Sequence, residues 1–224
     1  MALIAWAEMR QCISGDCYLI TLDHHTDTNP SYLRSLFKQV GRDLPQMEKL
    51  RQNRINGIHL SDPHSVIAAC DGLYHDEHID VAIRCGIFKT AFVIQHSHYK
   101  LLPEWIENNM VVWPTEIDLD RATEQEKRDY YDLALEDAFL ERQLLQWPGN
   151  FSLGNFQYIL DIDMDYFKTR QSLRPYSRSI IQSLVKGAVG ITIAQESEWV
   201  RRLYRDEPMA PSEMLNCLRA LLED

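Results

Sequence analysis

Five short apolar runs, rich in β-branched residues, constrain the fold of this chain more than any other feature. Each run is apolar on both faces over most of its length, which is typical of strands in a parallel sheet covered by helices. Segments with helical periodicity separate the runs. We therefore predict an α/β fold, a three-layer α/β/α sandwich with a mainly parallel sheet. The predicted strands are residues 17–23, 90–95, 110–113, 158–165 and 189–194.

The predicted helices lie between these strands. Three of these segments close on a glycine, Gly41, Gly86 or Gly187, as is common at a helix end. The chain has 224 residues, within the ~200–250 residues of many single α/β domains, so we expect one domain over residues 1–224. The predicted helices are residues 3–9, 31–41, 76–86, 123–146, 177–187 and 211–224.

Charge and cysteine usage narrow the class of protein. The formal net charge of −10 argues against a nucleic-acid partner, because phosphate contacts need a basic face. The five cysteines are spread along the chain without a C-x-x-C pair, which favours neither a disulfide framework nor a zinc ribbon. No apolar stretch approaches the ~20 residues that cross a bilayer, so we expect a cytoplasmic protein without a membrane partner. The sequence leaves the oligomeric state open.

A first group of chemically active side chains follows the first predicted strand. Asp23, His25 and Asp27 form the pattern D-x-H-x-D. In an extended chain alternate side chains share one face, so these three groups can converge around a cavity at the strand end. The alternative is a turn and capping cluster at residues 27–29, just before Pro30 and a predicted helix.

A second group of acidic residues interrupts the predicted strand 158–165. Asp161, Asp163 and Asp165 occupy alternate positions and are expected to share one face of this strand. Three carboxylates on a buried strand repel one another strongly unless a cation lies between them. The alternative, an exposed strand with an acidic face, conflicts with the apolar residues on both sides of the cluster.

Together the two groups predict a metal centre. Ligands of open α/β sheets bind at the carboxyl ends of the strands, where both groups fall. Carboxylates with an imidazole suit a hard or borderline divalent ion such as manganese. About five such ligands exceed the needs of one catalytic ion, so we expect two Mn²⁺ ions and a hydrolytic reaction.

With these motifs the sequence resembles the arginase/deacetylase superfamily, and within it the compact branch that includes peptide arginases. The resemblance implies an arginase-like metal-dependent hydrolase of guanidino C–N bonds. Its substrate would be an arginine-containing precursor peptide, whose arginine side chains it converts to ornithine and urea as a post-translational modification. The motifs that support it are LDHHTD (22–27), HDEHIDVAIRCGIF (75–88), YILDIDMDYF (158–167) and ITIA (191–194).

The resemblance also implies roles for individual residues. The metal ligands would be Asp23, His25, Asp27, Asp163 and Asp165. Asp161 would occupy the position of a serine in the superfamily pattern S-x-D-x-D, and aligning the motif one step earlier would make it a ligand. The superfamily takes a further histidine from a helix before the first strand, but no histidine precedes His24 here. One of the two ions is therefore expected to be weakly held.

Catalytic and substrate-binding roles complete the prediction. Asp27 would also hydrogen-bond the nucleophile, and His78 would act as general acid, unless its ring only packs within a helix. Glu196 would bind the guanidinium group, with Gln195 and Glu198 as alternatives, and Glu77 is a second candidate for substrate binding. Among the other histidines, His96 lies at the end of a predicted strand, where site residues gather.

Two other functions remain compatible with the sequence. The same metals could serve a ureohydrolase or a deacetylase that acts on a small molecule. Alternatively, the chain could be a non-catalytic binding protein on the same scaffold. Metal content separates this last possibility from the enzymes.

Overall fold

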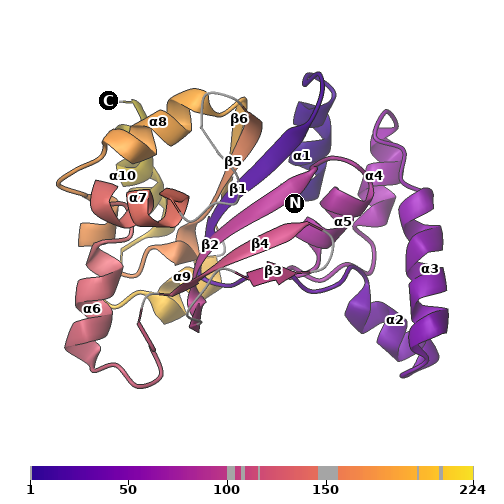
Figure 1. Cartoon of the computed structure of the whole chain (residues 1–224), viewed down its shortest axis with the longest axis horizontal. Coiled ribbons are helices and arrows are strands. Elements are labelled where there is room, and N and C mark those ends of the chain that lie inside the picture. Colours follow the sequence, from indigo (N-terminus) through magenta and orange to yellow (C-terminus); the bar gives the residue numbers. More distant parts are fainter. Residues whose placement is uncertain are drawn as a thin grey trace.

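The structure of the protein is a computed structural model, and it describes residues 2–99, 104–106, 109–115, 117–145, 156–195, 197–206 and 209–223. A six-stranded sheet with the order β3-β4-β2-β1-β5-β6 forms its centre (Figure 1). All neighbouring strands pair in parallel except β3, which is antiparallel to β4. The strands are β1 (Cys17–Asp23), β2 (Thr90–Tyr99), β3 (Glu104–Ile106), β4 (Met110–Thr115), β5 (Gln157–Asp163) and β6 (Gly190–Ala194).

Helices cover both faces of the sheet. One layer contains α1 (Ala2–Arg10), α2 (Leu33–Val40), α3 (Leu44–Asn56), α4 (Pro63–Ala69) and α5 (His78–Arg84). The other contains α6 (Glu124–Asp132), α7 (Asp137–Leu145), α8 (Ser179–Gly187), α9 (Ser197–Leu203) and α10 (Pro211–Glu223). Figure 1 shows the first layer on the right of the sheet and α6, α7, α8 and α10 on the left. The predicted three-layer α/β/α sandwich with a mainly parallel sheet is therefore confirmed.

Side chains of each strand alternate between two hydrophobic cores. In β1, Leu19 packs into the core beneath α1 to α5, whereas Ile20 and Leu22 pack into the core beneath α6 to α10. In β5, Ile159 faces the first core, and Leu160 and Ile162 face the second. Both faces of these strands are thus buried, which explains why their sequences are continuously apolar.

The predicted helix 123–146 is in fact two helices, which corrects that prediction. Helix α6 ends before Leu133, and α7 begins at Asp137. The carboxylate of Glu136, between them, accepts hydrogen bonds from the backbone N–H groups of Tyr176 and Ser177 at 2.7 and 2.9 Å. The break therefore gives Glu136 access to the segment that precedes α8.

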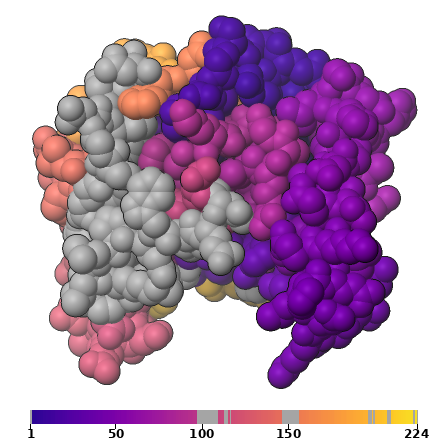
Figure 2. Space-filling view, turned by 45° about the vertical axis from the view of Figure 1, so that its right-hand side comes forward, coloured from indigo at the N-terminus to yellow at the C-terminus, as the bar shows by residue number. Residues whose placement is uncertain are grey.

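Four elements were not predicted: the 13-residue helix α3 and the shorter α4, α9 and β3. Helix α3 begins after Asp43, whose side chain accepts a hydrogen bond from the N–H of Gln46, and α4 begins after Asp62, which caps the N–H of His64. Helices α2 to α4 form a lobe that projects from one side of the molecule, separated by a hollow from the end that contains α6 (Figure 2). Among the described residues, no helix has both the length and the apolar character to cross a membrane.

Candidate metal centre and cavity

The two acidic strand ends lie side by side. Strands β1 and β5 are parallel neighbours in the sheet, with Thr21 opposite Asp161 and Leu22 opposite Ile162. The carboxyl ends of both strands therefore meet at one edge, although His24 and Asp165 are 141 residues apart in sequence. The prediction that these two ends meet is confirmed.

Asp23, His25 and Asp165 form a group that can hold a metal ion. Each offers one ligand atom, and these atoms all lie within 4.8 Å of one another. Nδ1 of His25 lies 3.4 Å from Oδ2 of Asp165. Asp23 and Asp165 are buried, and Oδ2 of Asp165 accepts no hydrogen bond within the described part of the chain. A buried carboxylate oxygen without a donor, next to a carboxylate and an imidazole, fits a divalent cation.

The chain turns sharply at both strand ends. At the end of β1, Oδ1 of Asp23 accepts a hydrogen bond from the N–H of His25 at 2.9 Å. Further along the same turn, Asp27 has a positive φ of 44°. Strand β5 ends at Asp163, whose Oδ1 accepts the N–H of Asp165 at 3.2 Å. The prediction of one extended strand with Asp165 on its acidic face is therefore wrong, because Asp165 reaches the group from a 3-10 helix, Met164–Tyr166.

The electrostatics of the group show how strongly the carboxylates crowd one another. Burial, together with the nearby charges of Asp27, Asp163 and Asp165, raises the pKa of Asp23 well above its usual range. The close approach of the Asp165 carboxylate, 3.4 Å from Nδ1, raises the pKa of His25. Burial opposes ionisation of Asp165, but His25 and the buried Lys168 lower its pKa. A bound cation would stabilise all of these carboxylates in their ionised form.

Asp161 lies outside the ligand group. Its carboxylate accepts hydrogen bonds from the hydroxyl groups of Thr21, at 3.2 Å, and of Thr192, which in turn accepts Nε1–H of Trp6 at 3.0 Å. Burial raises the pKa of Asp161 to about 6. These contacts direct the Asp161 carboxylate to threonine hydroxyl groups, as expected for a residue at the serine position of the S-x-D-x-D pattern.

A cavity of about 560 Å³ opens next to the metal group on the α1–α5 side of the sheet. Its acidic wall comes from the strand ends, and its apolar walls come from the start of α1, from the segment before α5 and from the end of β6. None of the described residues that line it is a lysine or an arginine. The acidic wall consists of Asp23, Asp27, Asp161 and Asp163.

Of the predicted catalytic and substrate-binding residues, the structure brings His78 and Asp27 to the cavity but not Glu77. His78 lines the cavity with its ring 5.2 Å from that of Trp6, and burial lowers the pKa of His78 to about 4. Asp27 also lines the cavity. The structure does not bring Glu77 there: its buried carboxylate accepts the backbone N–H groups of Arg34 and Tyr74 at 3.0 and 3.2 Å. These contacts explain its burial and give Glu77 a structural role in place of the predicted one.

The predicted guanidinium-binding residue, Glu196, lies outside the residues that the structure describes. Of its two alternatives, Gln195 lines the cavity directly after β6. Glu198 points into solvent and pairs with Arg202 at 2.7 Å in α9.

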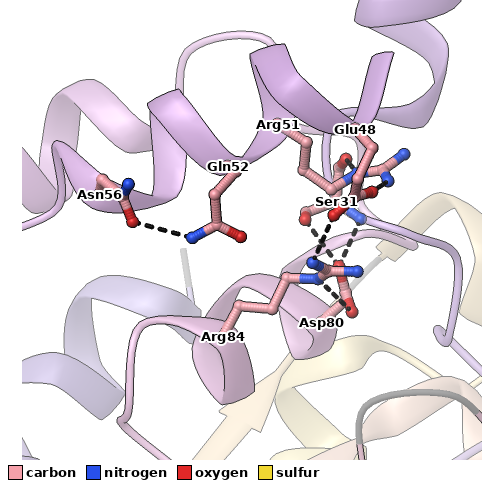
Figure 3. Close-up of polar contacts among 7 residues, drawn as sticks. All are labelled: Ser31, Glu48, Arg51, Gln52, Asn56, Asp80 and Arg84. Carbon is pink, nitrogen blue, oxygen red and sulfur yellow. Dashed lines mark hydrogen bonds and ion pairs between the residues drawn. The ribbon is translucent and has the colours of Figure 1, made fainter. Parts of the chain in front are cut away.

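The ligand loop, residues 24–31, carries His25 and Asp27, and Figure 3 shows the polar network at its last residue, Ser31. The carboxylate of Asp80, which is fully buried in α5, accepts hydrogen bonds from N–H and Oγ–H of Ser31 at 2.7 and 2.6 Å. Arg84 pairs with Asp80 at 2.9 Å, and Nε–H of Arg51 donates to the carbonyl oxygen of Ser31 at 2.7 Å. The end of the ligand loop is thus fixed to both α5 and α3.

Lys168, which lies next to the metal group, was not among the predicted site residues. Lys168 is 1% exposed, and its Nζ–H donates to the main-chain carbonyl oxygen of Asp165. Burial lowers the pKa of Lys168 to about 8, although the nearby carboxylates oppose this shift. A single lysine after an acidic strand end gives no periodicity or spacing signal, so its position could not be read from the sequence.

Comparison with known protein families and with curated proteins gives no match.

Proposed function

We propose that this protein is a metal-dependent hydrolase that converts arginine side chains of a precursor peptide to ornithine and urea. One observation supports the proposal most directly. The Asp23–His25–Asp165 group lies beside a cavity whose described lining contains carboxylates and no lysine or arginine. Such a cavity suits a substrate that is itself a cation.

Two divalent ions fit the donor set. Asp23, His25 and Asp165 would hold the first ion, and Asp27 and Asp163 would supply ligands for a second. Oxygen and imidazole ligands favour Mn²⁺ over metals that select thiolates. When bound, such ions supply an activated water molecule and Lewis-acid stabilisation of developing charge. We expect the first ion to bind more tightly, because its described ligands include an imidazole.

The charge of the cavity favours a guanidinium group. This planar cation carries a delocalised positive charge, and the acidic wall of the cavity provides a negative field for it. Free arginine would also bring an α-carboxylate, for which the described lining offers no cationic partner. An arginine within a peptide has a neutral amide at that position, so the peptide is the better match.

The reaction adds one water molecule across the scissile bond. The water oxygen forms a bond to the guanidinium carbon, the bond from that carbon to the side-chain nitrogen breaks, and a proton must reach this nitrogen to release the ornithine amine. Asp27 lies on the cavity wall, where its carboxylate can accept a hydrogen bond from the attacking water. His78 is neutral at pH 7, so it must take up a proton from the reacting water before it passes one to the leaving amine.

The experiment is to incubate the protein and Mn²⁺ with arginine-containing peptides, including those encoded beside its gene, and to measure urea and peptide mass. We expect urea release with the mass loss of arginine conversion to ornithine. Asp163→Asn should abolish turnover while the fold survives, and the exposed Asp71→Asn should leave turnover unchanged. Release of urea from free arginine alone, or loss of an acyl group from lysine, would favour a small-molecule enzyme. No Mn²⁺ binding after reconstitution would favour a binding protein.

A further inference from the structure

A second, smaller pocket lies at the same edge of the sheet but on the side covered by α6 to α10. Its volume is about 250 Å³. His24 and His96 form its base, from the residue after β1 and from β2. Lys127 of α6, Lys168 and Arg205 also line it. The proposed hydrolase does not use this pocket, because Asp23, Asp27 and Asp163 line the other cavity.

Three buried ring nitrogens of the two histidines at the base lack hydrogen-bond partners among the described residues. His96 is fully buried, and within the described part of the chain neither of its ring nitrogens has a hydrogen-bond partner. Nδ1 of His24 also has none. The ring of His96 is fixed by stacking on Tyr166, with centroids 4.2 Å apart. Every imidazole has at least one N–H donor, and buried donors are nearly always satisfied, so His96 lacks an acceptor here.

Lys168 adds a buried positive charge to this side of the centre. Its Nζ–H donates to the carbonyl oxygen of Asp165, and no carboxylate of the described residues lies within ion-pair distance of it. An ammonium group that is 1% exposed is costly without a negative partner. The pocket therefore places a buried cation next to unsatisfied N–H donors.

The charged residues that line the pocket are mostly cationic, which favours an anionic ligand. Three cations, Lys127, Lys168 and Arg205, line the pocket against one carboxylate, Asp120. Glu124 pairs with Lys127 at 3.0 Å and also with Arg205. Neutral imidazoles can bind metal ions, but these cations oppose a metal here. The volume is below the ~300–1,000 Å³ of pockets for drug-sized ligands, so the ligand must be small.

We propose that this pocket binds a small oxyanion, a phosphate or a carboxylate, between His24, His96 and Lys168. The oxyanion supplies the acceptor that His96 lacks and a negative charge in direct contact with Lys168, whose neighbouring carboxylates lie beyond ion-pair distance. Nζ of Lys168 also donates a hydrogen bond to the main-chain oxygen of Asp165. An anion in the pocket would therefore contact the metal group through Lys168.

The test is to titrate the full chain, freed of metal with a chelator, with sodium phosphate and with sodium acetate, against sodium chloride at equal ionic strength. Thermal unfolding and calorimetry provide the readouts. We expect a saturable rise in Tm and a measurable heat with phosphate, with acetate or with both, but not with chloride. The anion that saturates identifies the source of the oxyanion.

Two variants at the rim decide the outcome. Arg205→Gln and Lys127→Gln should each weaken anion binding about tenfold, because each removes a charge from the pocket. Lys89→Gln is the matched control: Lys89 is exposed, pairs with Asp16 on the surface and should bind the anion like wild type. His96→Phe keeps the stack on Tyr166 and should also weaken binding.

Absence of saturation with both anions would overturn the proposal. Equal anion affinity in wild type, Arg205→Gln and Lys127→Gln would do the same, even with saturation. Since the measurement uses metal-free protein and needs no turnover, it is independent of whether the protein hydrolyses peptidyl arginine.

Discussion

Asp165 connects the two sides of the centre. Its Oδ2 belongs to the metal group, its Oδ1 accepts the backbone N–H of His24 at 3.2 Å, and its main-chain oxygen accepts a hydrogen bond from Lys168. One residue thus orders a ligand loop, offers a ligand atom and contacts the buried cation. A substitution here should affect metal binding more than one at Asp161.

We predict that Asp165→Asn weakens Mn²⁺ binding by more than about tenfold, since an amide is a poorer ligand than a carboxylate. Asp161→Asn is the matched control, because Asp161 contacts threonine hydroxyl groups and lies outside the ligand group. Calorimetric Mn²⁺ titration measures both affinities. If Asp161→Asn lost as much affinity as Asp165→Asn, Asp161 would itself have to be assigned as a metal ligand.

At His78 the prediction concerns pH. Its pKa of about 4 in the folded chain lies below the unfolded value near 6.5, so the unfolded chain binds more protons between these values. The free energy of unfolding should therefore fall as the pH drops from about 6.5 to about 4, by as much as ~3 kcal/mol from this group. His78→Phe, which keeps an aromatic ring beside Trp6, should remove this loss.

Urea unfolding of wild type and His78→Phe across that pH range measures the difference. Asp161, whose raised pKa acts with the opposite sign between pH 3.8 and 6, is present in both proteins and cancels. Parallel stability profiles for the two proteins would show that His78 titrates normally.

Among the elements, α5 holds the ligand loop in place. Asp80 in this helix is fully buried and accepts hydrogen bonds from Ser31 and Arg84, so the loop is anchored only while α5 stays packed. Asn29, two residues after Asp27, donates its N–H to the carbonyl oxygen of Asp76 at 3.0 Å, just before the same helix. Packing of one helix therefore determines the position of His25 and Asp27.

Asp80→Ala should lower the free energy of unfolding by ~3 kcal/mol, because it leaves the buried N–H and Oγ–H of Ser31 without an acceptor and removes one of the two carboxylates that pair with Arg84. It should also weaken Mn²⁺ binding, since the loop that contains His25 loses its anchor. Glu48→Ala removes a partner of the same Arg84 from a side chain that is 50% exposed, and should cost less than ~1 kcal/mol. Urea unfolding and Mn²⁺ titration measure both effects, and equal losses in the two variants would contradict the anchoring role of Asp80.

Much of the element order could be predicted because its signals are local. Strands β1 and β5 are apolar on both faces, and Gly41 and Gly86 follow the ends of their helices. Helices α3 and α4 also had local signals, an aspartate cap followed by Pro45 or Pro63, which should have predicted them. The break at Glu136 depends on its bonds to residues 176 and 177, which no local pattern shows.

The candidate site could be predicted in part for the same reason. The alternation of acidic residues located both strand ends, and parallel pairing of β1 with β5 brought them together. The turns after the two strands were not predicted, although each contains a local hydrogen bond, from the N–H of His25 to Asp23 and from the N–H of Asp165 to Asp163. The burial of Glu77 under the backbone N–H groups of Arg34 and Tyr74 is non-local.

The molecule as a whole is an acidic body with an acidic cavity. Its formal net charge is −10, and the described cavity lining contains no lysine or arginine. A field of this sign raises the local concentration of cationic peptides, and salt screens it over a Debye length of ~10 Å at 0.1 M.

We therefore expect kcat/KM for an arginine peptide to fall as the salt concentration rises. Lysines placed beside the target arginine should steepen this dependence, and glutamates should flatten it. Initial rates of urea release over a salt series measure the effect, with sucrose as an uncharged control for viscosity. Identical rates at low and high salt for the parent peptide, the lysine-flanked peptide and the glutamate-flanked peptide would show that long-range attraction plays no part.

The position of β1 between β2 and β5 has a consequence for biosynthesis. A ribosome makes Asp23 and His25 early, but Asp165 follows only after the intervening 140 or so residues, and Thr192, which holds Asp161, comes later still. A nascent chain therefore exposes three of the five proposed ligands, Asp23, His25 and Asp27, long before Asp163 and Asp165 exist. Tight binding of an ion at this group would be a late event, and it would report that the central strands have assembled.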